Sequence, residues 1–264
     1  MKFNKIKNLC IVSLVLILAA CDSIVDEQYL ENTTDVAGVE LVATQTTTGG
    51  NKVTLDMVSP GVTGYWDFNL GRAFTNKTTF IYPIPGTATF TFTGTLGSEF
   101  FTKTIDVQID QLDNALDQDW YDLVSEDTAV GKTWVYAATP GNGNFWYMSA
   151  PGDKSNWASL WWNAGDCCCP DPFGKIHFDL NGAANYTYYA EADGAGALGS
   201  FVLDVANQKL QIKEQPLMGG NLDGGAGNSD GIYEIVSLTE DELVLYVSNS
   251  EVHGTGWTWI FKPE

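Results

Sequence analysis

Hydrophobic and polar residues alternate along short segments through much of the chain, and glycine and proline separate these segments. In the first half the alternation is clearest at Val53–Val58, Thr87–Thr93 and Thr102–Ile109. Strict alternation over about four to eight residues is typical of a strand with one buried face. We therefore expect residues 38–111 to form a small β-sandwich.

A second set of alternating segments follows a polar linker at residues 112–118. Apart from a short helical turn expected at Asp119–Ser125, no segment of residues 119–264 shows helical periodicity. About nine antiparallel strands predict a larger β-sandwich or a lipocalin-like barrel, so the fold class is all-β. The strands are expected at Lys132–Ala138, Gly143–Ser149, Lys175–Leu180, Asn185–Glu191, Gly199–Val205, Lys209–Lys213, Gly231–Leu238, Glu242–Ser248 and Gly256–Lys262.

Residues 1–20 have the pattern of a signal peptide. Three lysines precede the apolar stretch from Leu9 to Leu18, which is shorter than the ~20 residues that span a membrane. The ending Leu18-Ala19-Ala20-Cys21 resembles a bacterial lipobox, which implies cleavage before Cys21 and lipidation of its thiol. We expect a lipid-anchored protein outside the cytoplasm; an uncleaved anchor is the alternative.

Residues 21–37 form an acidic tether with no basic residue. Acids directly after the lipidated cysteine resemble the surface-export signal of some Gram-negative lipoproteins, which implies an outer-membrane, cell-surface location. A solvated linker explains the same composition equally well.

The charge balance narrows the range of partners. The chain has 13 Lys and Arg, 33 Asp and Glu, and a formal charge of −20. Loss of Lys2, Lys5 and Lys7 with the signal, and of no acid, would bring it to −23. Such a surface repels phosphate backbones, which argues against nucleic-acid binding and favours neutral ligands.

Eight of the nine tryptophans lie in the second domain, more than one core easily hides. Trp157, Trp161 and Trp162 fall in a long Asn-, Gly- and Pro-rich segment, where they could cover a satellite core or form an exposed platform. An indole ring stacks on the C–H face of a sugar, and Asn163, Asp166 and His253 could bond its hydroxyls. We expect Trp134 and Trp259 to lie in the core, whereas Trp146 and Trp257 fit either the core or the platform.

Two resemblances sharpen this interpretation. Tyr65-Trp66-Asp67-Phe68 and Tyr82-Pro83-Ile84-Pro85-Gly86-Thr87 resemble the PKD family of immunoglobulin-like domains, although Asn69-Leu70-Gly71 replaces the usual Gly-Asp-Gly. This resemblance implies that the first domain is a spacer whose tryptophan belongs to the core.

The second domain resembles a domain common in surface glycan-binding lipoproteins of polysaccharide-utilisation systems. This likeness implies binding of a neutral polysaccharide, preferably a β-1,3-glucan such as laminarin. The matching segments are Gly131–Val135, Trp161–Gly165, Phe178–Gly182, Tyr233–Asp241 and Gly256–Phe261.

Other candidates remain open. The adjacent Cys167, Cys168 and Cys169 form either a loop cluster, oxidised or free, or a vicinal disulfide platform beside a ligand. No cofactor is required, but the Gly-rich segment 219–231 could bind Ca²⁺ rather than form a plain loop. Its oxygen ligands would come from Asn221, Asp223, Asn228 and Asp230.

Support for catalysis is weak, so we expect a binding protein and not an enzyme. No paired-carboxylate strand motif frames the acids, Glu240-Asp241-Glu242 fits a turn, and His177 fits a structural role on a strand. The alternatives are an adhesion or assembly subunit of an outer-membrane transporter complex and, with less support, a glycoside hydrolase.

Overall fold

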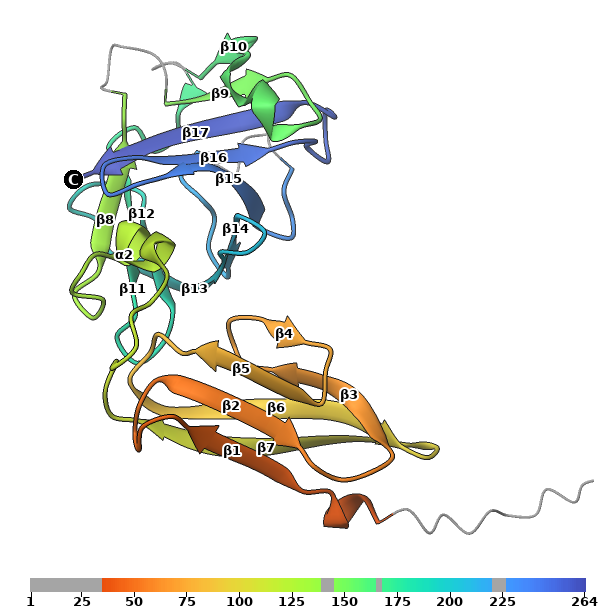
Figure 1. Ribbon diagram of the computed structural model, residues 1–264. Helices are drawn as coiled ribbons and strands as arrows, with labels where there is room; N and C mark the ends of the chain where they lie inside the picture. The colour runs from red at the N-terminus through yellow and green to blue at the C-terminus, as the bar shows by residue number, and fades with distance from the viewer. Residues whose placement is uncertain (1–34, 139–144, 165–167, 220–226) are drawn as a thin grey trace, which may run out of the picture. The chain divides into compact units, whose positions relative to one another are not determined.

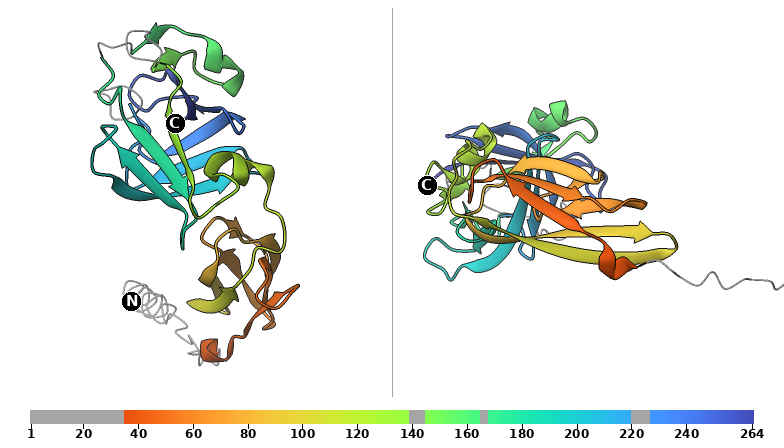
Figure 2. Two further views of the ribbon diagram at one scale, coloured as in Figure 1. Left: turned by 90° about the vertical axis from the view of Figure 1, so that its left-hand side faces the viewer. Right: turned by 60° about the horizontal axis from the view of Figure 1, so that its bottom comes forward.

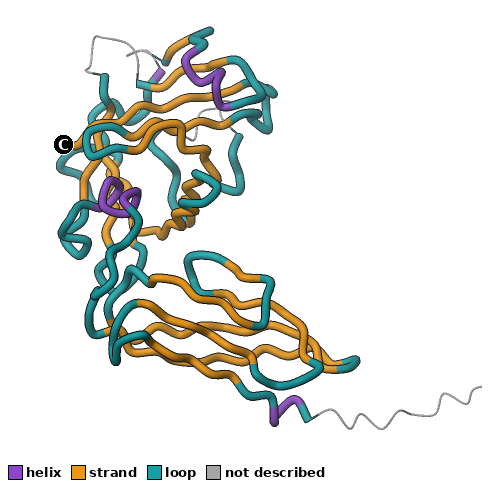
Figure 3. The backbone as a smooth tube through the Cα atoms, in the orientation of Figure 1, coloured by secondary structure: helices purple, strands orange, loops and turns teal. Residues whose placement is uncertain are grey.

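The computed structural model describes residues 35–138, 145–164, 168–219 and 227–264. Strands and loops make up nearly all of this backbone (Figure 3), which confirms the all-β fold class. The compact part of the chain, Val39–Glu264, contains two separate sheet systems. The signal peptide, Cys21 and nearly all of the acidic tether lie outside the described residues, and no described helix is long and apolar enough to cross a membrane.

The first sheet system is a sandwich of two antiparallel sheets (Figure 1). One sheet has the order β1-β2-β5 and the other β4-β3-β6-β7. The short 3-10 helix η2 (Val36–Gly38) comes before the sandwich. The strands are β1 (Leu41–Gln45), β2 (Lys52–Met57), β3 (Val62–Asp67), β4 (Arg72–Ala73), β5 (Lys77–Ile81), β6 (Gly86–Leu96) and β7 (Glu99–Ile109).

The alternation predicted for this sandwich is present in three dimensions. On β6, Phe90 and Phe92 are fully buried while the intervening threonines face outward. Trp66 is also fully buried, packs edge-on against Phe92 and donates its indole N–H to the carbonyl of Asn76. The expectation that this tryptophan belongs to the core is confirmed.

The second sheet system is a closed barrel, so of the two predicted forms the barrel is correct. Its eight strands follow the order β8-β11-β12-β13-β14-β15-β16-β17, and β17 pairs back with β8 through Phe261 opposite Tyr136. Figure 2 shows these strands wrapping around one interior. The strands are β8 (Lys132–Tyr136), β11 (Lys175–Asp179), β12 (Asn185–Tyr189), β13 (Ala197–Asp204), β14 (Lys209–Lys213), β15 (Ile232–Leu238), β16 (Leu243–Val247) and β17 (Gly256–Pro263).

Helix α2 (Gln118–Val124) closes one end of the barrel, close to the predicted helical turn. Asp117 caps it by accepting from the backbone N–H of Asp119. The Trp134 indole donates to the carbonyl of Leu123, and Trp120 contacts the ring of Phe201. Because Trp134 and Phe201 belong to the barrel core, α2 seals the interior at their end.

The segment between β8 and β11, which we call the flap, adds two short strands and a 3-10 helix to the barrel. β9 (Trp146–Ser149) pairs with the first half of β17, and β10 (Trp162–Asn163) pairs with β9 (Figure 1). Between them, the 3-10 helix η3 (Lys154–Ala158) packs against β17. The sequence predicted β9 but treated residues 149–174 as a long loop, so η3 and β10 correct that expectation.

The flap also explains why β16 has no alternation. All five of its residues are buried, because η3 covers the face that would otherwise meet solvent. Tyr246 on that face donates its hydroxyl to the carbonyl of Ala150 at 2.6 Å. A strand covered on both faces is apolar throughout, as Leu243–Val247 is.

Candidate functional site

Strand register brings several tryptophans to one face of the flap. Met148 on β9 lies opposite Trp162 on one side and Trp257 on the other, and Trp146 lies opposite Trp259. Side chains two residues apart on a strand share a face. Trp146, Trp162, Trp257 and Trp259 therefore all face the side that continues the barrel interior.

Three of these rings are in contact, and we call Trp146, Trp162 and Trp257 the tryptophan cluster. Their ring centroids lie 5.5 Å apart for Trp146–Trp162, 5.3 Å for Trp146–Trp257 and 6.3 Å for Trp162–Trp257. Trp162 is 40% exposed, whereas Trp146 and Trp257 are buried at 1% and 4%. The cluster thus presents one indole to solvent and rests on two buried ones.

The cluster lies at the barrel end away from α2. Trp134, which bonds to α2, is opposite Pro263 at the last residue of β17, whereas Trp257 lies near its first residue. Trp257 and Pro263 are six positions apart on the strand, about 20 Å at the usual rise per residue. A ligand at the cluster would meet the barrel at the end that α2 leaves uncovered.

Among the described residues, the buried indole N–H groups of Trp146, Trp257 and Trp259 have no hydrogen-bond partner. An indole nitrogen can only donate, and a buried donor without an acceptor costs about 1–3 kcal/mol. Two of these donors, Trp146 and Trp257, belong to rings that contact the exposed ring of Trp162.

Of the other predicted platform residues, Trp157 and Asn163 lie on the opposite face of the flap from the cluster. Trp161 is 55% exposed next to β10, and Asn163 on β10 pairs with Tyr147. Trp157 is half-buried in η3, and its carbonyl accepts from Thr258, whose side chain faces away from that of Trp257. The predicted trio is therefore divided, because η3 packs on the face of β17 opposite the cluster.

Two further predicted ligand contacts have different outcomes. His253 is exposed in the turn that joins β16 to β17, in the same hairpin as Trp257. Asp166 lies outside the described residues. Trp134 and Trp259 are fully buried, which confirms both as core residues.

Next to the cluster is a buried carboxylate that sequence reasoning missed. Asp171, only 2% exposed, accepts hydrogen bonds from the hydroxyls of Tyr136 at 3.1 Å and Tyr188 at 2.9 Å. The backbone N–H of Gly219 bonds to both carboxylate oxygens, at 3.1 and 3.0 Å. This Asp171 network links β8, β12 and the loop after β14; the only sequence signal was an acid between two prolines.

Gly219 connects the Asp171 network to the tryptophan cluster. It has a left-handed φ of 69°, and a Cβ atom placed there would lie 2.5 Å from Trp146 Nε1 and 2.8 Å from the Tyr136 hydroxyl. Glycine is therefore required for both its conformation and its close neighbours. It leaves the N–H edge of Trp146 free of any side chain at position 219.

The cysteine run touches the same network. Cys168 is disulfide-bonded, whereas Cys169 is a free thiol 3.5 Å from Asp171. Cys167 lies outside the described residues, so the vicinal pairing stays a prediction. Burial raises the pKa of Cys169 to about 11, and burial followed by the Asp171 charge raises the pKa of Tyr136 and of Tyr188.

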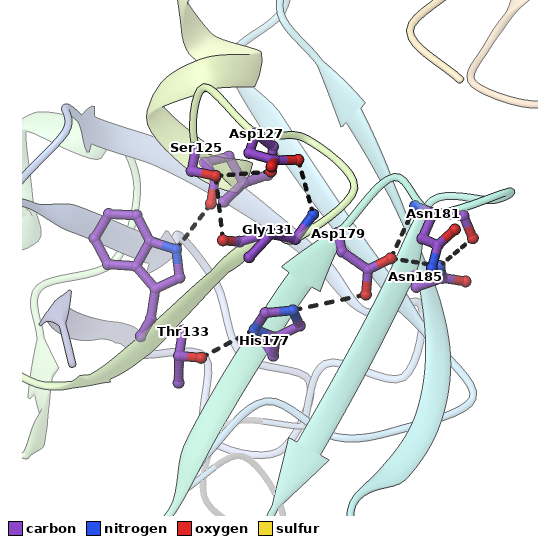
Figure 4. A network of polar contacts seen from close by, with 11 residues as sticks. Ser125, Asp127, Gly131, Thr133, His177, Asp179, Asn181 and Asn185 are labelled. Atoms are coloured by element: carbon purple, nitrogen blue, oxygen red, sulfur yellow. Dashed lines mark hydrogen bonds and ion pairs between the residues drawn. The ribbon is translucent and has the colours of Figure 1, made fainter. Parts of the chain in front are cut away.

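His177 belongs to a separate polar network at the start of β8 (Figure 4). Its Nδ1 lies 2.9 Å from the Thr133 hydroxyl, and its Nε2 lies 3.7 Å from a carboxylate oxygen of Asp179. Asp179 also accepts from the backbone of Asn181 and the side chain of Asn185. These contacts link β8 to β11 and agree with the structural role expected for His177.

The remaining predictions concern Ca²⁺ and the acidic turn. Asn221 and Asp223 lie outside the described residues, while Asn228 and Asp230 bond to the backbone N–H and carbonyl groups of their own turn. No group of three or more metal-binding side chains occurs in the described ranges. Glu240–Glu242 forms the turn between β15 and β16, as expected, with the Thr239 hydroxyl accepting from two backbone N–H groups.

The candidate site is thus the tryptophan cluster, backed by the Asp171 network. Its chemistry is that of an uncharged aromatic surface with unused N–H donors, which suits a neutral ligand with C–H faces and oxygen acceptors. No family model and no curated protein matches the chain.

Proposed function

We propose that this chain is a cell-surface lipoprotein that binds a neutral polysaccharide through the tryptophan cluster. Lipid on Cys21 anchors it, the acidic tether and the sandwich extend it, and the barrel captures the glycan for an uptake or degradation system. The preferred ligand is a β-1,3-glucan such as laminarin. The proposal contains no catalytic step and requires no cofactor.

The observation that carries the proposal is the exposure of Trp162 above two buried indoles. The ring of Trp162 is 40% exposed, whereas the rings of Trp146 and Trp257 are almost fully buried. Contacts with these two rings support Trp162 and leave part of it open to solvent. An indole face stacks on the C–H groups of a pyranose, and each such contact contributes on the order of 1 kcal/mol beyond area burial. The net charge of −20 suits a neutral glycan better than an anionic one.

Affinity gel electrophoresis tests the proposal, using the chain from Asp22 to Glu264, which keeps every described residue. We expect laminarin to retard its migration without releasing reducing sugar. Trp162→Ala should abolish the retardation, whereas Leu198→Ala, a change at a 75% exposed side chain on β13, should leave it intact. Retardation that survives Trp162→Ala would refute the role of the cluster.

The same gels distinguish the alternatives. An assembly subunit gains support from Leu160 and Trp161, two exposed apolar side chains beside the edge strand β10, which could receive a strand from a partner. No retardation by any neutral glucan, mannan or xylan, together with co-purification of an outer-membrane transporter, would favour that function. Release of reducing sugar would instead indicate a hydrolase.

A further inference from the structure

Two of the buried indole N–H groups that have no partner in the described part of the chain belong to the tryptophan cluster, and a purely stacking site would leave them unused. The rings of Trp146 and Trp257, which carry these donors, contact the exposed ring of Trp162. Buried polar groups in native proteins almost always have partners, so these two call for an explanation.

The backbone of Gly219 packs closely against the N–H edge of Trp146. A Cβ atom at position 219 would stand 2.5 Å from Trp146 Nε1, so only glycine fits beside that edge. Asp171 holds the Gly219 backbone by accepting its N–H. The position of the glycine is therefore fixed by the fold, and among the described residues the indole donor beside it has no acceptor.

The three rings lie close together, but only one is open to solvent. Their centroids are 5.3, 5.5 and 6.3 Å apart, and Trp162 is the exposed member of the group. A sugar offers C–H groups on its faces and oxygens at its rim. A sugar that stacks on Trp162 would therefore reach the two buried donors only if Trp162 moves.

We propose that Trp146 and Trp257 are specificity-determining donors, whose indole N–H groups pair with two oxygens of a saccharide stacked on Trp162. This inference rests on the proposed function and deepens it. Stacking alone accepts many sugars, whereas hydrogen bonds to two donors would make the site distinguish sugars by the positions of their oxygens. Since both nitrogens are buried, Trp162 shifts when the sugar enters. β10 permits this shift, because it has only two residues and, in the described chain, pairs with β9 alone.

Nuclear magnetic resonance of the indole N–H groups tests the inference on the unaltered residues. The probe is laminarihexaose, titrated into the chain from Asp22 to Glu264, with signals assigned from single Trp→Phe variants. We expect the Trp146 and Trp257 signals to move downfield and saturate together. The Trp259 signal should stay in place, because its equally unpaired N–H lies outside the cluster.

Each other outcome has a defined meaning. If only Trp162 responds, the sugar stacks without these hydrogen bonds, and the inference falls while the proposed function stands. If Trp259 moves as much as the others, the change is general and direct pairing is refuted. If no tryptophan signal responds to laminarihexaose or to any oligosaccharide of the mannan and xylan series, the inference and the proposed function both fail.

Binding measurements supply an independent arm. Trp146→Phe and Trp257→Phe remove the donor but keep an aromatic ring, and each should weaken laminarihexaose binding about tenfold, as expected for one lost hydrogen bond. Trp259→Phe is the matched control, since it makes the same change at a buried, unpaired indole, and it should bind normally. Equal losses in all three variants, or none, would overturn the assignment.

Discussion

The hydroxyl of Tyr136 donates to Asp171 at 3.1 Å, and within the described chain that carboxylate has no cationic partner. Neutral donors satisfy it instead: a second tyrosine, Tyr188, and the backbone N–H of Gly219. Because these donors come from elements that are not adjacent in the sheet, one side chain holds the loop beside Trp146 against two separate strands. Asp171 thus contributes both to the stability of the barrel and to the shape of the tryptophan cluster.

Replacing Asp171 with alanine should therefore be costly. The change leaves the Tyr136 hydroxyl and the Gly219 N–H buried without an acceptor and removes the partner of the half-buried Tyr188 hydroxyl, so we expect a loss of about 3 kcal/mol or more in the free energy of unfolding. Urea unfolding followed by tryptophan fluorescence measures it. Asp204→Ala is the control, because Asp204 accepts only from Asn207 in an exposed turn; a similar loss in both variants would contradict the prediction.

The same network predicts a loss of stability at alkaline pH. Burial, with the Asp171 charge as a smaller cause, raises the folded-state pKa of Tyr136 and Tyr188 above 10.0, and burial raises that of Cys169 from 9.0 to about 11. A group whose pKa is raised by folding stabilises the protein below its unfolded pKa, and this contribution is lost as pH rises through the folded pKa.

We therefore expect the urea midpoint to fall as pH rises from about 9 to above 11. The first part of that fall should diminish in Cys169→Ala, which removes the thiol that titrates earliest. A midpoint that stays constant between pH 9 and 11 would refute the alkaline prediction.

Gly131→Ala should destabilise the start of β8. Gly131 has a φ of 79°, and an added Cβ would come within 2.3 Å of the carbonyl of Phe178. Gly182→Ala is a matched control, since Gly182 has a φ of 77° but open space around it. The control should lose about 1 kcal/mol from backbone strain alone, and Gly131→Ala should lose at least about 1–3 kcal/mol more. Equal thermal shifts would show that the close contact does not matter.

If the proposed lipid anchor on Cys21 holds the protein at the membrane, Cys21→Ser should release it. Without a thiol at position 21 no lipid can be attached, so the chain should move from the membrane pellet to the soluble fraction and lose labelling by radioactive palmitate. Cys169→Ser should keep both properties. Continued membrane attachment of Cys21→Ser would instead support an uncleaved apolar anchor.

The sequence by itself determined the local elements of this protein. Alternating side chains identified the all-β class, and Lys209–Lys213 was predicted to the residue as β14. It also assigned Trp134 and Trp259 to the core, because period-two patterns report which face of a strand is buried. The turn at residues 240–242, between β15 and β16, was predicted because polar residues separate two apolar runs there.

Only the tertiary structure decided how these elements close and meet. The choice of barrel over sandwich depends on β17 pairing with β8, a contact between the two ends of the domain that no local pattern encodes. The two-residue strand β10 is too short to produce a pattern, yet it places Trp162 against Trp146 and Trp257. Asp171 and Gly219 likewise become partners only when distant loops converge, because burial and hydrogen bonding depend on distance in space and not along the chain.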